Sequence, residues 1–370
     1  MPAPIPWLWL YRPPVPTARA QSIQVLHMAH AMAARGHEVT LAADPSAPGL
    51  LPADVLRWYG LAPLPTLHLH LLPGARTPAS LAFRALLVGW LARHRHRGVV
   101  YARHKRYARL ALRLGGRVIW EAHEVDSLQA AERGEDPTLH RELERRLVHR
   151  AAGVVTNAPG TLDLLRTTWP DLPSAVALLN ASAVRPAPGE GVGIGYLGSL
   201  RAWKDLDTLA RAAAHIDTPV TLVGADPASA EARRLRALSG ARLRVEAPIP
   251  YAAVSERLAA FRVLVLPLGQ GLLPERLVSP LKLADYLATG RRIVAADHPS
   301  VRALTRDFVP YASGDPADLA RALTTARDLP PRTPSPRTWA TRAAEVEDFV
   351  LGTWTKGRQP SPRAPVGSAR

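Results

Sequence analysis

The chain has 370 residues, of which 47 % are hydrophobic and 21 % charged, a composition that excludes a disordered or fibrous protein and suits about two globular domains. It contains no cysteine, so disulfides, thiol catalysis and cysteine-ligated metals are excluded. No window reaches the roughly 20 apolar residues of a membrane-spanning helix, and no basic segment precedes the short apolar run at the N-terminus, so no secretory signal is expected.

The formal net charge of +16 is unevenly distributed. Between Asp54 and Glu121 there is no acidic residue but there are twelve Lys or Arg, most of them within Arg93–Arg117. Such a segment attracts phosphates on nucleic acid, on an anionic membrane or on a small substrate, although a solvated basic surface explains it equally well. Since aromatic residues are sparse and no nucleic-acid-binding module is present, specific nucleic acid binding is not expected.

Strand and helix signals alternate through the N-terminal half. The elements expected there are strands at 5–12, 37–43, 98–102, 117–121 and 152–156, a helix at 18–35 that ends at Gly36, and a helix opened by Asp136-Pro137. The second of these helices carries Leu139, Leu143 and Leu147 at a spacing of four residues. No Gly-x-Gly-x-x-Gly follows the first strand, which argues against an NAD-dependent enzyme.

A change of composition at Ser182–Gly193 predicts a linker between two domains, 1–181 and 194–335. The elements expected after it are strands at 194–197, 220–223, 243–246, 262–267 and 292–296, and helices at 205–214, 227–238 and 280–289. A further helix is expected at 336–356, followed by a disordered tail at 357–370. Two alternating halves of this kind predict an α/β protein with two doubly wound, Rossmann-like domains facing a cleft.

The segment Ser279–Gly290 has the features of an anion site. Ser279 is a good N-cap, Pro280 suits the first helical position and Gly290 suits the end of the helix. Such a helix start offers free N–H groups and a positive dipole end, to which Lys282 adds a charge. Asp285, about one and a half turns further on, is able to accept hydrogen bonds from sugar hydroxyls. A phosphate beside a ribose fits both features, although solvated helix starts share this pattern.

A second candidate segment, Gly198–Lys204, also follows a predicted strand. The strand ends at Gly198, and Arg201 and Lys204 follow in the loop before a helix. Ligands of doubly wound sheets bind outside the carboxyl ends of the strands, where both segments are expected. Arg201 and Lys204 could therefore neutralise a diphosphate held between two helix N-termini.

Together these segments resemble the donor-binding domain of retaining glycosyltransferases of the GT-B fold, family 4 (glycosyl transferases group 1). The resemblance covers about residues 5–355. The matching segments are Ser22–Val39, Glu121–Glu124, Val155–Asn157, Gly198–Lys204, Leu222–Gly224, Ile249–Tyr251, Val263–Pro267, Ser279–Gly290 and Ile293–Ser300. The resemblance implies that the helix at 336–356 crosses back to the first domain.

The resemblance also implies roles for individual residues. The residues expected to be catalytic are His123, which would face the donor sugar, and Arg201 and Lys204, which would contact the donor phosphates. Those expected to bind the donor are Gly198, Ser199, Ile249, Tyr251, Ser279, Leu281, Lys282 and Asp285, the last through the ribose hydroxyls. Those expected near the acceptor are Ser22, Gln24, Glu121 and Glu124. A lone histidine at a strand end is also commonly a structural polar residue, so His123 has both interpretations.

The chain departs from the family pattern at several positions. Ser199 stands where an Arg is common, so Arg201 must substitute or a contact is lost. Leu277 stands at the first of two paired acids, two residues from Glu275, and Asp285 replaces the usual second Glu. A proline-rich loop at 13–19 replaces a Gly-Gly loop near the acceptor.

The sequence therefore predicts a retaining glycosyltransferase that takes a sugar from a nucleotide-diphospho-sugar. The acceptor would be a polysaccharide precursor, a lipid-linked sugar or a small metabolite. No cofactor is expected, and no metal either, because no His/carboxylate cluster with the spacing of metal ligands is present. The expected location is the cytoplasm, with peripheral contact to an anionic inner membrane face. The alternatives are a nucleotide-binding protein of this fold without transferase activity and a sugar-nucleotide epimerase.

Overall fold

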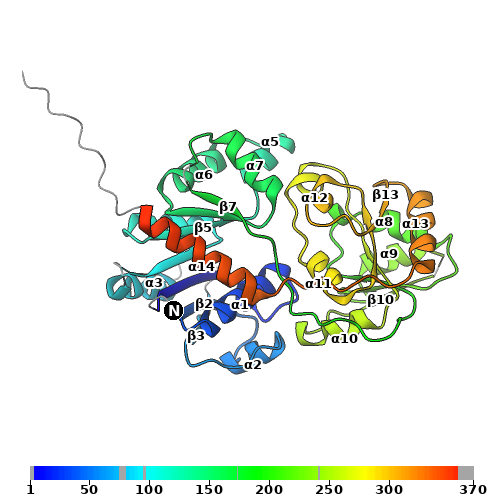
Figure 1. Ribbon diagram of the computed structural model, residues 1–370, viewed down its shortest axis with the longest axis horizontal. Coiled ribbons are helices and arrows are strands. Elements are labelled where there is room, and N and C mark those ends of the chain that lie inside the picture. Colours follow the sequence, from blue (N-terminus) through cyan, green and yellow to red (C-terminus); the bar gives the residue numbers. More distant parts are fainter. Residues whose placement is uncertain (1–3, 75–80, 95–96, 173, 241, 357–370) are drawn as a thin grey trace, which may run out of the picture.

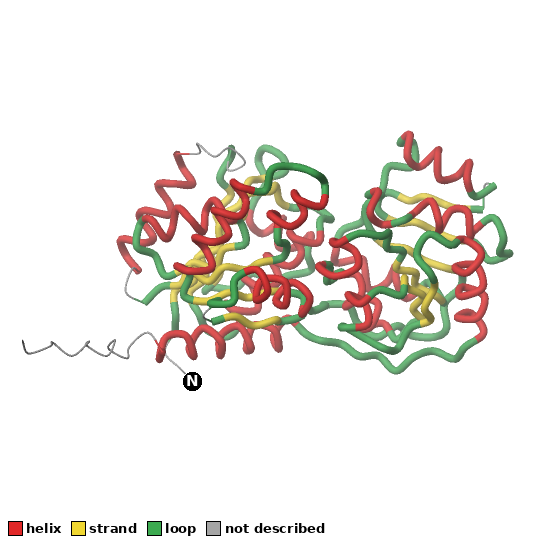
Figure 2. The backbone as a smooth tube through the Cα atoms, turned by 90° about the horizontal axis from the view of Figure 1, so that it is seen from above, coloured by secondary structure: helices red, strands yellow, loops and turns green. Residues whose placement is uncertain are grey.

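The computed structural model describes residues 4–74, 81–94, 97–172, 174–240 and 242–356, which form two α/β domains side by side (Figure 1). In each domain a parallel sheet lies between layers of helices, as the view from above shows (Figure 2). The predicted fold class, two doubly wound α/β domains, is confirmed. The predicted tail at 357–370 lies outside the described residues.

The first domain has a seven-stranded parallel sheet in the order β3-β2-β1-β4-β5-β6-β7. Its strands are β1 (Pro6–Val15), β2 (Glu38–Pro45), β3 (Leu67–Leu71), β4 (Val99–Ala102), β5 (Val118–Ala122), β6 (Gly153–Thr156) and β7 (Ala175–Ala177). Its helices are α1 (Ala20–Ala34), α2 (Pro52–Trp58), α3 (Leu81–His94), α4 (Lys105–Arg113), α5 (Asp126–Glu132), α6 (Thr138–Arg150) and α7 (Pro159–Thr168). The central strands are continuous apolar runs because helices cover both faces of the sheet.

The second domain has a six-stranded parallel sheet in the order β10-β9-β8-β11-β12-β13. Its strands are β8 (Ile194–Leu197), β9 (Val220–Val223), β10 (Leu243–Glu246), β11 (Val263–Leu266), β12 (Arg292–Ala296) and β13 (Val309–Tyr311). Its helices are α8 (Leu206–Ala213), α9 (Ala230–Leu238), α10 (Val254–Ala259), α11 (Leu281–Thr289), α12 (Pro299–Arg302) and α13 (Pro316–Asp328). Short helical turns occur at Ala202–Lys204, Tyr251–Ala253 and Leu273–Leu277, the last a π-helix.

The chain crosses between the domains twice, and the two crossings run side by side. Ser182 in the first crossing donates its backbone N–H to the carbonyl of Arg337 in the second, at 2.8 Å. The last helix, α14 (Trp339–Lys356), then packs on α1 and β6 of the first domain (Figure 1). The C-terminal segment thus ties the second domain back to the first.

Several local differences separate the structure from the sequence-based expectations, which included none of the helices α2–α5, α7, α10, α12 and α13. Helix α11 begins at Leu281 with Pro280 as its N-cap, one residue later than predicted, because the Ser279 hydroxyl caps no N–H group. Leu139 was expected on an apolar stripe of α6 but is 71 % exposed. The short strands β3, β7 and β13 were not predicted. Among the described residues, no helix combines the length and hydropathy needed to span a bilayer.

Candidate functional site

Two lysine side chains meet beside the carboxyl end of β8. The Lys204 Nζ donates to the Oγ of Ser199 at 2.8 Å and to its carbonyl at 3.1 Å. The Lys282 Nζ lies 3.9 Å from the centre of the Tyr196 ring. The two amino groups are close enough for each to affect the pKa of the other. No described carboxylate forms an ion pair with either lysine, so the positive charge here has no counter-ion within the described chain.

The pKa values of both lysines are lowered, mainly because the amino groups are withdrawn from solvent. Burial and the nearby charge of Arg201 lower the pKa of Lys204 to about 8. Burial and then the charge of Lys204 lower the pKa of Lys282 well below its usual range. The neutral amine of Lys282 can therefore accept a hydrogen bond from the Lys204 ammonium. An anion placed between the two groups would restore both charges.

Gly198 and the start of α11 complete this anion site. Gly198 has φ +145, and a Cβ at this position would lie 2.8 Å from the Lys282 Nζ. The absence of a side chain is therefore what allows Lys282 to approach the end of β8. Lys282 is the second residue of α11, so its backbone N–H and that of Leu281 have no acceptor within the helix. Two lysines and a helix N-terminus together suit a diphosphate.

Asp285 lies further along α11, at the junction of the domains. Its Oδ1 accepts hydrogen bonds from the Ser182 hydroxyl at 2.6 Å and from the Tyr251 hydroxyl at 2.8 Å. Burial raises the pKa of Asp285 to about 6, against the opposing effect of these two hydrogen bonds. Its Oδ2 accepts no hydrogen bond from the described residues and remains available to a ligand hydroxyl.

Tyr251 was expected near the nucleotide base, but it is only 5 % exposed and connects the domains. Its hydroxyl bonds to Asp285, and its ring meets the edge of His27 from α1 at 5.0 Å. His27 in turn stacks on Trp339 at the start of α14. The Tyr251 ring is therefore part of the contact between domains, whereas Ile249, two residues earlier, is half-buried against the core.

A second cluster lies in the first domain and joins Gln24, Glu121 and His123. The Gln24 Nε2 donates to the Glu121 Oε1 at 2.7 Å and lies 3.3 Å from the His123 Nε2. The His123 Nε2 is 3.5 Å from the Glu121 Oε2. Arg103 donates to the Gln24 Oε1 at 2.8 Å, and Arg342 of α14 donates to the Glu121 Oε1 at 2.6 Å. The five side chains form one buried polar network.

The network holds His123 neutral. Burial and the charge of Arg103 lower the pKa of His123 to about 4, although Glu121 acts in the opposite direction. Arg342 holds the pKa of Glu121 well below its usual range despite the burial of this carboxylate. His123 can thus donate or accept a hydrogen bond at neutral pH, while Glu121 stays ionised.

Of the remaining expected residues, Ser22, Glu124 and Arg201 lie outside these hydrogen-bonded contacts. Ser22, expected near the acceptor, is fully buried, and its hydroxyl bonds to Tyr11 and Thr17. Glu124, Arg201 and Ser199 are exposed.

The position of the family's first acid also has a structural explanation. Leu277 is fully buried against apolar residues of the first domain, and its carbonyl accepts from Thr161 of α7. A carboxylate could not be solvated there. Nearby, Glu275 accepts from the backbone N–H of Gly271 in its own turn.

Sequence reasoning missed Arg103 and Arg342. Arg103 belongs to the basic segment noticed in the sequence, but Arg342 carries no local signal, since only the fold brings α14 to β5. The described residues contain no group of three or more His, Asp or Glu side chains placed to hold a metal ion.

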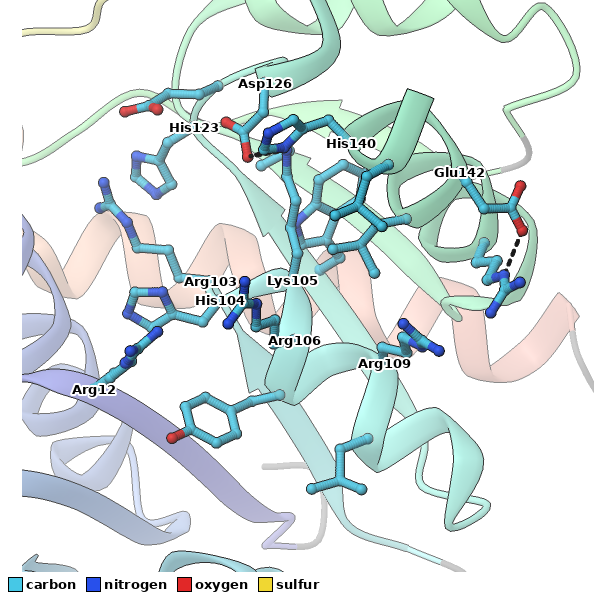
Figure 3. A pocket seen from close by; sticks show the side chains of 18 of the residues that line it. Arg12, Arg103, His104, Lys105, Arg106, Arg109, His123, Asp126, His140 and Glu142 are labelled. Carbon is cyan, nitrogen blue, oxygen red and sulfur yellow. Dashed lines mark hydrogen bonds and ion pairs between the residues drawn. The ribbon is translucent and has the colours of Figure 1, made fainter. Parts of the chain in front are cut away.

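A cavity of about 880 Å³ opens beside this second cluster, and His123, Arg103 and residues of α4 line it (Figure 3). Its lining is rich in arginine.

Comparison with known proteins agrees with this arrangement. Residues 20–179 match the glycosyl transferase 4-like domain, and residues 191–327 match the glycosyl transferases group 1 family. No curated protein sequence matches the chain significantly.

Among solved structures, sucrose-phosphate synthase from Thermosynechococcus elongatus is similar, with a TM-score of 0.67 and 16 % identity over 96 % of this chain and 98 % of that one. Anabaena HepE in complex with UDP and glucose has a TM-score of 0.65 and 14 % identity over 95 % of this chain and 98 % of that one. The catalytic domain of Arabidopsis thaliana starch synthase IV, bound to ADP and acarbose, has a TM-score of 0.63 and 10 % identity over 95 % of this chain and 100 % of that one. These likenesses are to GT-B glycosyltransferases, and with the two family matches they show that the chain belongs to the group 1 glycosyltransferases.

Proposed function

We propose that this glycosyltransferase moves a sugar from a nucleotide-diphospho-sugar to an acceptor hydroxyl, with retention of configuration and without a metal. The observation that carries the proposal is the pair of the buried Lys204 and the half-buried Lys282, which has no carboxylate partner among the described residues. Without a counter-ion the pair does not hold both charges, and a bound anion would restore them, so such a pair favours an anionic ligand. A nucleoside diphosphate supplies that anion, as in the similar structures with UDP or ADP.

The rest of the donor fits around this diphosphate. The N–H groups at the start of α11 would bind its oxygens, and the free Oδ2 of Asp285 would accept a ribose hydroxyl. Arg201 is exposed and close enough to Lys204 to lower its pKa, so it would reach the same phosphates from the solvent side. These charges would stabilise the leaving diphosphate without a metal.

Retention is proposed from the resemblance to the retaining glycosyltransferases of the GT-B fold, and transfer on one face of the sugar is preferred here to a double displacement. Glu121 is buried and held by Gln24 and Arg342, so it is not free to attack a sugar carbon. Transfer on one face of the sugar, with the leaving diphosphate taking the acceptor proton, requires only positioning and charge stabilisation. His123, held neutral, would hydrogen-bond a sugar hydroxyl.

The test is a thermal-shift panel of UDP, GDP, ADP, TDP and their glucose conjugates. A nucleotide at a hundred times its Kd should stabilise the wild type by about 2.7 kcal/mol. Lys204→Ala and Lys282→Met should lose the shift, whereas Arg244→Ala, which removes an exposed charge on β10, should keep it. If no nucleotide raises the melting temperature of the wild type, the proposed donor site is wrong.

Turnover separates transfer from its alternatives. A transferase releases free nucleotide only as acceptor is consumed or slowly by hydrolysis, and proton NMR of the first product identifies the anomer. An epimerase instead changes the sugar nucleotide without releasing it. A protein that only binds nucleotides does neither.

A further inference from the structure

The cavity of the first domain is large enough for a small ligand. Its volume of about 880 Å³ lies within the roughly 300–1,000 Å³ of typical ligand sites. It lies where β1, β4 and β5 end, and α4 forms one wall (Figure 3). His123 lines the same cavity, so the cavity is continuous with the proposed catalytic region.

The carboxylates on the cavity wall are largely neutralised. Asp126 forms an ion pair with Lys105 at 2.8 Å. Glu142 accepts from the Arg146 Nε at 2.5 Å. Only Glu124, which is exposed, has no partner of this kind within the described chain.

The arginines on the opposite wall carry an excess of positive charge. Arg106, Arg109 and Arg113 follow each other at three- and four-residue spacing, so they lie on one face of α4. None of the three forms an ion pair with a described carboxylate. Arg103 beside them donates to the neutral amide of Gln24. This wall therefore has four cations that form no ion pair within the described chain, and the carboxylates nearest to them, Glu121 and Glu124, act only on Arg103.

Two nitrogen atoms of this wall are buried without a hydrogen-bond partner, the Nε of Arg109 and the Nε2 of His104. Buried polar groups in folded proteins are nearly always hydrogen-bonded, so these two atoms indicate a missing partner. Burial and the charges of Arg103 and Arg12 lower the pKa of His104 to about 4, which leaves it neutral and able to donate one hydrogen bond. Figure 3 shows His104 beside Arg103, with Arg106 and Arg109 along α4.

We propose that this cavity binds an acceptor that carries a phosphate group, held by Arg106, Arg109 and His104, with its reactive hydroxyl directed toward His123. A phosphate has enough oxygens to accept hydrogen bonds from a guanidinium and from a further N–H group of this wall. The inference rests on the proposed function, because it identifies the class of acceptor that the transferase uses.

The phosphate could belong to a soluble sugar phosphate or to a lipid headgroup. Helix α3, which contributes Arg84 to the cavity, exposes Leu81 at 79 % and Val88 at 52 %. A lipid would bring its phosphate to the cavity from a membrane surface. The experiment therefore includes both sources.

The test measures binding to the full chain, saturated with the nucleotide that stabilises it best. The soluble probes are glucose 6-phosphate, fructose 6-phosphate and inositol 1-phosphate, each compared with its unphosphorylated form by calorimetry. The lipid probes are vesicles with 20 % phosphatidylglycerol or with phosphatidylcholine alone, compared by flotation. The variants are Arg106→Gln and the double variant Arg106→Gln/Arg109→Gln, with Arg150→Gln on the exposed end of α6 as the control.

We expect at least one phosphorylated probe, soluble or lipid, to bind at least tenfold more tightly than its phosphate-free counterpart. The double variant should lose at least tenfold of that affinity, Arg106→Gln a smaller part and Arg150→Gln none. The proposal is overturned if no probe shows a phosphate preference, or if the preference survives the double variant. The nucleotide thermal shift, measured on the same samples, reports the donor site separately, so its loss would count against the proposed function instead.

Discussion

The guanidinium of Arg342 donates a hydrogen bond of 2.6 Å to the carboxylate of Glu121, across 221 residues of sequence. Both side chains are almost completely buried, with exposed fractions of 0 % and 2 %. The pair fixes α14 to the end of β5, directly behind His123. It therefore joins the last helix of the chain to the polar network of the first domain.

Removing Arg342 should be strongly destabilising. Arg342→Met leaves the Glu121 charge buried without its main partner, which costs about 3–5 kcal/mol in comparable pairs. Arg321→Met, which removes an exposed i,i+3 ion pair in α13, should cost less than about 1 kcal/mol. Urea unfolding measures both, and equal midpoints for the two variants would contradict the role assigned to Arg342.

The sequence predicted the central strands and the two strand-to-helix segments of the candidate site because each has a local signal. Apolar runs mark β9, β11 and β12, and Gly290 marks the end of α11. The edge strands β3, β7 and β13 were missed because short strands at a sheet edge carry few buried apolar residues.

The partners of the site residues could not be predicted, because they depend on tertiary contacts. Nothing in the local sequence around Asp285 shows that Ser182 and Tyr251 occupy its Oδ1. Nothing around Ser22 shows that Tyr11 and Thr17 enclose its hydroxyl.

Nucleotide binding should take up protons above neutral pH. The pKa of Lys204 is lowered to about 8 and that of Lys282 further, and a bound diphosphate raises both. Affinity should therefore fall as pH rises from 7 to 9, with proton uptake on binding. Calorimetry at pH 8 in two buffers of different ionisation enthalpy measures the uptake. Equal apparent enthalpies in the two buffers would contradict the coupling, and Lys282→Met should reduce it.

Gly198→Ala should impair the donor site directly. The added Cβ would lie 2.8 Å from the Lys282 Nζ and 3.2 Å from the Tyr196 hydroxyl, and φ +145 disfavours any side chain. We expect a loss of about 1–3 kcal/mol in stability and at least tenfold in nucleotide affinity. Gly89→Ala in α3 meets no atom within 4 Å and should be neutral or stabilising. If Gly198→Ala left the nucleotide affinity unchanged, Lys282 would not be a phosphate-binding residue.

The folded protein should lose stability as the pH falls below about 6.5. Burial is the main reason why the pKa values of His27, His104 and His123 are lowered to about 3, 4 and 4. Between these values and about pH 6.5 the histidines are neutral in the folded chain but bind protons when the chain unfolds. Their contribution is complete above pH 6.5 and declines toward pH 4, by up to about 1.4 kcal/mol per pH unit for each group. Asp285, whose pKa is raised to about 6, makes the folded chain more stable as the pH falls, but this one group opposes three histidines. Urea midpoints that stay constant between pH 7.5 and 5 would contradict this balance.

The contact between α7 and the π-helix at Leu273–Leu277 should control how closely the domains approach. A Cβ at Gly160 would lie 2.2 Å from the carbonyl oxygen of Arg276, and the neighbouring Thr161 donates to the carbonyl of Leu277. Because backbone lies on both sides, Gly160→Ala cannot be accommodated by a side-chain rotation, and the two domains must separate locally. We expect it to cost about 1–3 kcal/mol and to expose the Leu277 region to limited proteolysis. Transfer should fall further than nucleotide affinity, since the Lys204–Lys282 pair lies within the second domain whereas His123 lies in the first. An equal loss in both would show that the variant disturbs the donor domain itself and not the contact between the domains.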